Sequence, residues 1–148
     1  MPLRKKDPPK DGVYETMFMI TINTNKDYSR GNDQLFKKAE AWTDKTCTRA
    51  EFPKYVKLID DDKILSMRIP HITAIGSRRR DVHVHMLVLI RHTKNYRGTC
   101  HIDLKKMTSS FLKATGIDSC HLDVKVRDPA TFENELDYLK RNAYKKDS

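Results

Sequence analysis

The sequence predicts an α+β fold in which helices cover a small antiparallel sheet. Three observations support this prediction. Residues 16–23, 81–90 and 121–126 alternate between apolar and other side chains, as strands do. Segments near 33–42, 104–114 and 129–143 carry apolar residues at helical spacing. The two kinds of segment interleave along a chain of 148 residues, a length that suits one domain with a real core.

The first half of the chain predicts a strand, a helix and a second strand. The strand over 16–23 turns Phe18, Ile20 and Ile22 to one face. Asn32 or Asp33 is available to cap the helix that follows. Its apolar stripe consists of Leu35, Phe36, Ala39 and Trp42. Residues 43–62 show no clear pattern, and residues 64–76 predict a strand bent at Pro70.

The second half predicts two strands and two helices. The strand over 81–90 forms an antiparallel hairpin with the bent strand before it. Asp103 caps a helix over 104–114 that ends at Gly116, and a fourth strand spans 121–126. Asp128 and Pro129 open a last helix, whose buried stripe consists of Phe132, Leu136, Leu139 and Ala143. The order βαββαβ plus a terminal helix predicts a ferredoxin-like or RRM-like sheet.

Composition points to a nucleic-acid partner in a reducing compartment. Net charge is +9, from 29 Lys and Arg against 20 Asp and Glu, so the surface attracts polyanions. Cys47, Cys100 and Cys120 lack CxxC spacing, which argues against disulfides and zinc fingers. No apolar run predicts a membrane span or a signal peptide. We expect a basic flexible arm over 1–13, one domain over 14–148, no membrane partner, and a nuclear or cytoplasmic rather than secreted protein.

Two histidines at the start of the third strand are candidate metal ligands. His83 and His85 share one strand face beside the turn at 78–80, where a ligand can enter. Imidazoles in a strand also bond simply to backbone carbonyls or to water, and this alternative stays open. Tyr138 lies at the margin of the apolar stripe of the last helix. If that helix packs near the open sheet face, the phenol can reach a metal there, although amphipathic packing is the common role of such a tyrosine.

Three short motifs carry a family resemblance. The segments Ile20-Thr21-Ile22-Asn23, His83-Val84-His85 and Tyr138-Leu139-Lys140-Arg141 occur in the order and approximate spacing of the motifs of HUH endonucleases. Over about residues 14–144 the chain resembles the nuclease domain of rolling-circle replication initiators (Rep) of small circular single-stranded DNA viruses. The resemblance implies that Tyr138 is the nucleophile, that His83 and His85 bind Mg²⁺ or Mn²⁺, and that Asn23 marks the first motif.

The sequence departs from this family at two positions. The family's lysine three residues after the tyrosine is Arg141 here, with Lys140 adjacent, so either cation can serve the phosphate. In relatives a glutamate on the neighbouring strand often completes the metal site. With a turn over 77–81, the residue across from His83 is expected to be Ile75, and His71 on the same face becomes the candidate third ligand. A packing or DNA-contacting histidine is the alternative for His71, and Tyr144 is the alternate nucleophile.

The resemblance implies a nicking and joining endonuclease that forms a 5′-phosphotyrosine at a replication origin. Its partners are single-stranded DNA and an origin stem-loop, and a C-terminal helicase domain and oligomers belong to the same expectation. A basic group near the site is suited to phosphates and consists of Arg78, Arg79, Arg80, Arg91, Lys94 and Arg97, with Tyr96 among them. A single-tyrosine HUH transposase and a non-enzymatic origin-binding or RNA-binding domain remain alternatives.

Overall fold

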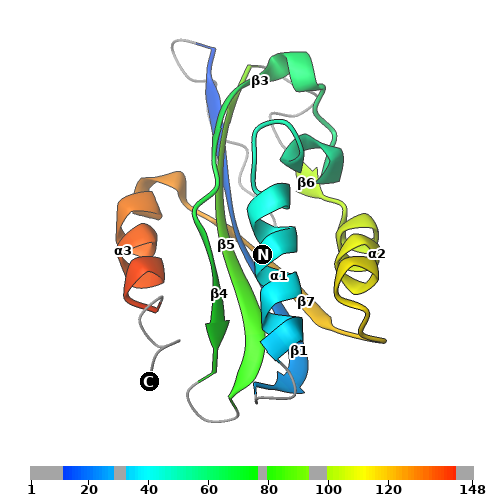
Figure 1. The fold of residues 1–148 in the computed structure, drawn as a ribbon. Coiled ribbons are helices and arrows are strands. Elements are labelled where there is room, and N and C mark those ends of the chain that lie inside the picture. Colours follow the sequence, from blue (N-terminus) through cyan, green and yellow to red (C-terminus); the bar gives the residue numbers. More distant parts are fainter. Residues whose placement is uncertain (1–11, 29–32, 77–79, 94–99, 143–148) are drawn as a thin grey trace.

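The fold is an antiparallel sheet with helices on both faces (Figure 1). The structure is a computed structural model that describes residues 12–28, 33–76, 80–93 and 100–142. In these ranges the main sheet contains β1 (Tyr14–Asp27), β3 (Ile64–Arg68), β4 (His71–Ile75), β5 (Asp81–His92) and β7 (His121–Arg127). Strand order is β3-β5-β1-β7, and β4 also pairs with β5. Every pairing is antiparallel, so the predicted α+β class with an antiparallel sheet is confirmed.

Two strand segments share one edge of β5 because Pro70 interrupts them. β3 pairs with the second half of β5 and β4 with the first half. Proline has no N–H to donate to a ladder, but its carbonyl oxygen still accepts a hydrogen bond from the Leu87 N–H at 2.9 Å. The predicted bend at Pro70 and the predicted hairpin are therefore both confirmed.

The helices divide between the two faces of the sheet. α1 (Asp33–Thr46) and α2 (Leu104–Thr115) cover one face, and α3 (Phe132–Asn142) covers the other (Figure 1). The capping predictions for α2 are confirmed. The Asp103 carboxylate accepts from the Lys106 N–H at 3.1 Å, and Gly116 ends the helix at φ 77°. α3 begins three residues after Pro129, because Pro129–Thr131 form a 3-10 turn, η5.

Of residues 43–62, which the sequence left unassigned, the first four complete α1, and the rest include short elements at one end of the sheet. These are the 3-10 helices η2 (Phe52–Tyr55) and η3 (Asp61–Lys63), and β2 (Val56–Lys57), which pairs with β6 (His101–Ile102). The Trp42 indole N–H and the Tyr55 hydroxyl both donate to Ser110 Oγ, at 2.9 and 2.8 Å. Side-chain hydrogen bonds to Ser110 thus join both α1 and this segment to α2.

Apolar side chains form one core on each face of the sheet. The larger core lies under α1 and α2 and includes Phe18, Ile20, Ile22, Val82, Val84, Met86, Val88 and Ile90. The smaller core lies under α3 and consists of Met17, Leu87, Leu89, Phe132, Leu136 and Leu139, with Met19 and Ile72 packed against it. Because α3 covers only part of its face, the remainder of that face carries polar residues of β1, β5 and β7.

Several predictions concern residues outside the described ranges. These are the arm before residue 12, the cap at Asn32, the buried position of Ala143, the second tyrosine Tyr144, and the basic residues Arg78, Arg79, Lys94 and Arg97, with Tyr96. None of the described helices is long and apolar enough to cross a membrane.

Candidate metal and nucleophile site

His83 and His85 lie side by side on the sheet face that α3 partly covers. Along β5 the neighbouring Val82, Val84 and Met86 are fully buried on the opposite face, as the strand alternation predicts. The centroids of the two imidazole rings are 4.7 Å apart, and the ring planes meet at 79°. The prediction that both histidines share one face is confirmed.

The hydrogen bonds of the two rings leave nitrogen atoms available for a cation. His83 Nδ1 lies 3.1 Å from the Asp81 carbonyl oxygen. A carbonyl only accepts, so this nitrogen carries the proton and Nε2 of the neutral ring keeps its lone pair. His85 Nδ1 lies 3.2 Å from Thr21 Oγ1. In metal sites, a ligating histidine usually has its other ring nitrogen hydrogen-bonded to an oxygen atom of the protein in this way.

His85 is held in its neutral form. Burial, together with a smaller repulsion from the neighbouring His83, lowers the pKa of His85 from its ordinary 6.5 to about 4. A cation must displace any proton from its ligand nitrogen. Because His85 carries no charge at neutral pH, no proton on that ring has to be displaced before its free nitrogen can bind a cation.

The strand pairing places apolar residues on one side of the two histidines and polar residues on the other side. On the β4 side, Ala74 lies opposite His83 and Ile72 lies opposite His85. On the β1 side, Asn23 lies opposite His83 and Thr21 lies opposite His85. One strand further out, β7 continues the two rows with His121 and Asp123. In the described residues no third histidine, cysteine or carboxylate is close enough to the pair to form a group of three.

The expected register of the hairpin was wrong by one residue, and this removes His71 from the site. The Gly76 N–H donates to the Asp81 carbonyl at 2.9 Å, so Ala74, rather than Ile75, pairs with His83. His71 consequently pairs with Met86, whose side chain lies in the core under α1 and α2.

The contacts of His71 agree with this placement on the opposite face. Its Nδ1 lies 2.7 Å from the Ile69 carbonyl oxygen, and its Nε2 lies 3.0 Å from Asp44 Oδ1 on α1. The side chain therefore joins β4 to α1 and has no access to a cation held by His83 and His85.

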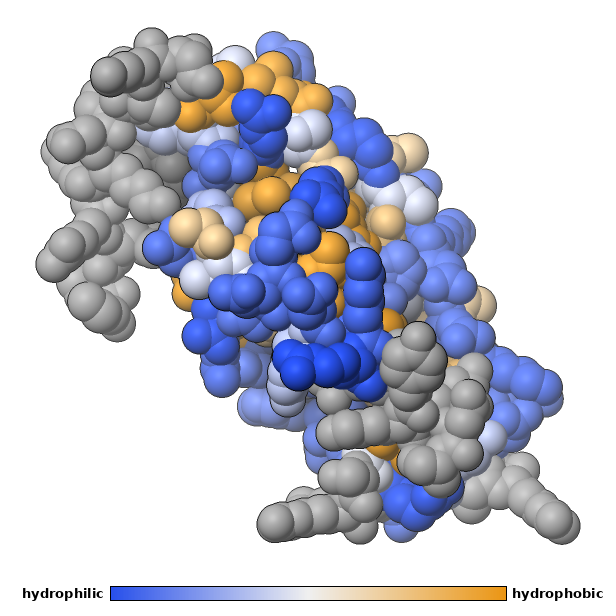
Figure 2. Space-filling model, turned by 90° about the vertical axis from the view of Figure 1, so that its left-hand side faces the viewer, coloured by the Kyte–Doolittle hydropathy of each residue, from blue (hydrophilic) through white to orange (hydrophobic). Residues whose placement is uncertain are grey.

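Tyr138 lies on the exposed surface of the helix that covers this sheet face. The buried stripe of α3 consists of Phe132, Leu136 and Leu139. Tyr138 is 56% exposed, more than its predicted position at the margin of that stripe implies. No hydrogen bond between the described residues joins its hydroxyl to either histidine. Figure 2 views this side of the molecule and shows a mostly hydrophilic surface with apolar patches between the polar side chains.

An ion pair at the start of α3 fixes which flank of the helix carries Tyr138. Arg68 of β3 contacts Glu133 at 3.3 Å and places its guanidinium 4.3 Å from the centre of the Phe132 ring. This orients the Glu133 flank toward the β3 and β4 edge. Residues advance by about 100° along a helix, so Tyr138 falls on the other flank of the buried stripe. Tyr138 is about 120° from the centre of that stripe, so its side chain points mainly away from the sheet, in agreement with its exposure.

Lys140 and Arg141 are both exposed near the C-terminal end of α3. That end of the helix lies beside β4 and β5 (Figure 1). Around the helix, Lys140 lies about 160° from Tyr138, whereas Arg141 lies about 60° from it, so Arg141 is the cation on the same side of α3 as the phenol.

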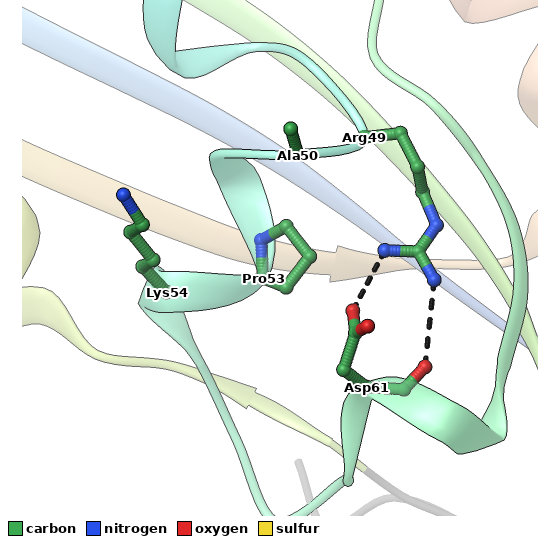
Figure 3. A pocket seen from close by; sticks show the side chains of 5 residues that line it. All are labelled: Arg49, Ala50, Pro53, Lys54 and Asp61. Carbon is green, nitrogen blue, oxygen red and sulfur yellow. Dashed lines mark hydrogen bonds and ion pairs between the residues drawn. The ribbon is translucent and has the colours of Figure 1, made fainter.

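A surface hollow elsewhere in the protein has no comparable chemistry. It lies between the end of α1 and η3 and is lined by Arg49, Ala50, Pro53, Lys54 and Asp61 (Figure 3). Arg49 donates to the Asp61 carboxylate at 2.7 Å, and Lys54 donates to Glu51 at 2.7 Å. Each cation of the hollow is therefore paired with a carboxylate, Arg49 with Asp61 of the hollow itself and Lys54 with Glu51 outside its lining.

Comparison with known proteins gives no family for the chain. No protein-family model matches it, and no curated protein matches its sequence.

Proposed function

We propose that this protein is a metal-dependent single-stranded DNA endonuclease with strand-joining activity, of the kind that initiates rolling-circle replication. The observation that carries the proposal is the His83 and His85 pair, with its engaged Nδ1 atoms, on the sheet face that also receives the tyrosine-bearing helix α3. The strand order supports it as well. If β3 and β4 count as one interrupted strand, the order β4-β5-β1-β7 with helices after β1, β5 and β7 corresponds to a ferredoxin-like sheet with an added helix.

The proposed reaction is a transesterification at one phosphodiester. The Tyr138 hydroxyl oxygen attacks phosphorus, the bond from phosphorus to the 3′ oxygen breaks, and that oxygen takes up a proton while the phenol loses one. The products are a 5′-phosphotyrosyl DNA and a free 3′ hydroxyl. Attack of a 3′ hydroxyl on the phosphotyrosine reverses the step and joins two strands.

Protein side chains have separate tasks in this scheme. His83 and His85 hold Mn²⁺ or Mg²⁺, which supplies charge stabilisation at the scissile phosphate when bound. Arg141, one turn beyond Tyr138, contributes positive charge beside the phenol, and Lys140 adds positive charge on the other side of α3. A net charge of +9 favours binding of the DNA strand and of an origin stem-loop. A helicase domain beyond this chain and oligomeric assembly are further parts of the proposal.

Covalent capture of DNA tests the proposal. The protein is incubated with Mn²⁺ and a random single-stranded oligonucleotide library labelled at the 3′ end, because the 3′ fragment stays on the tyrosine. Denaturing electrophoresis then separates the labelled adduct. We expect an adduct with the wild-type protein and with Tyr28→Phe, a matched control on another tyrosine, and none with Tyr138→Phe.

The histidines are tested in the same assay. His83→Ala and His85→Ala should each abolish the adduct, and a chelator should abolish it in the wild-type protein. An adduct that survives Tyr138→Phe would contradict the assignment of the nucleophile.

A non-enzymatic nucleic-acid-binding domain is the second candidate. The exposure of Tyr138 and its lack of a hydrogen bond to the histidines favour this candidate. It predicts DNA or RNA binding without any adduct and without a Mn²⁺-dependent change in melting temperature.

A further inference from the structure

We propose that the outer edge of β7 pairs with the same edge of a second copy of this chain, in an antiparallel arrangement centred on Val124. β7 is the last strand of the main sheet, and within the described residues only β1 pairs with it. The pairing joins the main sheets of two copies across a two-fold axis, and it is independent of the nuclease chemistry.

β7 has the features of a sheet edge that can accept another strand. It runs for seven residues without a proline, its register with β1 contains no bulge, and none of its residues is buried. An edge strand carries a row of unpaired backbone N–H and C=O groups, which proteins commonly protect with prolines, bulges or very short strands. The opposite edge of this sheet is interrupted in that way at Pro70, between β3 and β4. The edge open to a further strand is therefore β7.

The charges of β7 select one register for two identical antiparallel strands. In a regular antiparallel pair, opposite residues turn their backbone groups the same way, so the two-fold axis passes through a residue. An axis through Val124 sets Asp123 of each copy opposite Lys125 of the other. An axis through Asp123 or through Lys125 instead sets two like charges directly opposite each other. Opposite charges across a strand pair stabilise it and like charges destabilise it, which favours the axis through Val124.

The apolar side chains of β7 agree with the same register. Leu122 and Val124 pack against the core under α1 and α2. Val126 follows on the same strand face but is 45% exposed. The axis through Val124 places Val126 opposite Leu122 of the second copy and sets the two Val124 side chains opposite each other. The pairing therefore covers an exposed apolar side chain with another apolar one.

The charged side chains are available for pairing across the axis. Asp123 and Lys125 are 48% and 61% exposed, and within one strand their charged atoms are 4.0 Å apart. A surface ion pair of this length contributes little free energy, so its exchange for pairs across the axis costs little. The net charge of +9 repels a second copy. At physiological ionic strength, however, charges more than about 8 Å apart are largely screened, and adjacent side chains dominate.

Analytical ultracentrifugation at physiological ionic strength, with protein up to about 0.5 mM, tests the inference. The wild-type protein should form dimers that dissociate on dilution, because a single seven-residue edge makes a small interface. Lys125→Asp and Asp123→Lys should each weaken the association by at least about 10-fold, because both ion pairs become repulsive. Lys105→Asp, at an exposed residue of α2, makes the same change of charge as Lys125→Asp and should associate as the wild type does.

An equimolar mixture of Lys125→Asp and Asp123→Lys distinguishes a charge effect at this edge from a loss of folding. One strand then carries two carboxylates and the other two ammonium groups, and the axis through Val124 sets each carboxylate opposite an ammonium group. We expect the mixture to form dimers again, which misfolded variants would not do.

Four results would each overturn the inference. These are a wild-type protein that stays monomeric over the whole concentration range, single variants at Asp123 and Lys125 that associate as the wild type does, a mixture that stays monomeric, and equal weakening by Lys105→Asp.

Discussion

The neutral state of His85 has a measurable consequence for the pH dependence of folding. Burial lowers the pKa of His85 from 6.5 to about 4 in the folded protein. The unfolded chain therefore binds a proton at this residue between these two pH values, whereas the folded chain does not. Above pH 6.5 both states are neutral at His85, and this residue does not reduce the free energy of unfolding. As the pH falls from 6.5 toward 4, protonation of the unfolded chain lowers the free energy of unfolding.

The two pKa values set the size of the effect. At pH 5 the unfolded state gains about 2 kcal/mol from protonation of His85, and at pH 7 it gains only about 0.2 kcal/mol. Wild-type protein should thus lose about 2 kcal/mol more of its free energy of unfolding between pH 7 and pH 5 than His85→Asn does. Asparagine keeps a polar group near Thr21 but does not titrate in this range.

Urea unfolding at pH 7 and pH 5 in the presence of a chelator measures this difference. His92 is also buried, and burial lowers its pKa, so wild-type protein has a second contribution that the comparison with His85→Asn removes. His121→Asn is the control for the loss of one imidazole from the same sheet face. Equal losses for wild type and His85→Asn would refute the conclusion that the folded protein desolvates this imidazole.

Three further predictions concern the stability of the fold and the burial of its side chains. Leu139→Ala, at a residue 3% exposed under α3, should destabilise the protein by about 2 to 4 kcal/mol in urea unfolding, whereas Leu65→Ala at a half-exposed residue should change stability by less than about 0.5 kcal/mol. Gly116→Ala should cost about 1 kcal/mol in thermal unfolding because φ is +77°, although an added Cβ would touch no neighbour; an unchanged melting temperature would contradict this. Burial raises the pKa of the Cys47 thiol to about 12, so iodoacetamide at pH 8 should modify Cys47 in native protein at least about 100-fold more slowly than in urea, as peptide mass spectrometry can measure.

Local sequence patterns were sufficient for most of the elements. Alternation identified β1, β5 and β7, and the caps Asp103 and Gly116 identified the ends of α2, because strand alternation and helix capping depend on neighbours within a few residues. The short elements at 52–63 were missed. They depend on contacts with distant residues, such as the hydrogen bond from Tyr55 to Ser110.

The site was predictable along β5 but not across the sheet. Alternation alone placed His83 and His85 on one face. The identity of their neighbours depends on the register between strands. The expected hairpin was shifted by one residue, so Ile75 was expected opposite His83 where Ala74 lies, and His71 was expected on the face that it does not occupy. His121 and Asp123 were not connected to the pair, since the sequence does not state that β7 lies next to β1.

The sequence by itself determined that this protein has a strand with two histidines on one face and a late helix with a tyrosine beside its apolar stripe, because periodicity is a local property. Tertiary structure decided that α3 covers the histidine face, that β4 presents apolar residues to the pair, and that β1 and β7 present polar ones. Strand order and register result from the burial of two separate apolar faces, and that burial involves the whole chain at once.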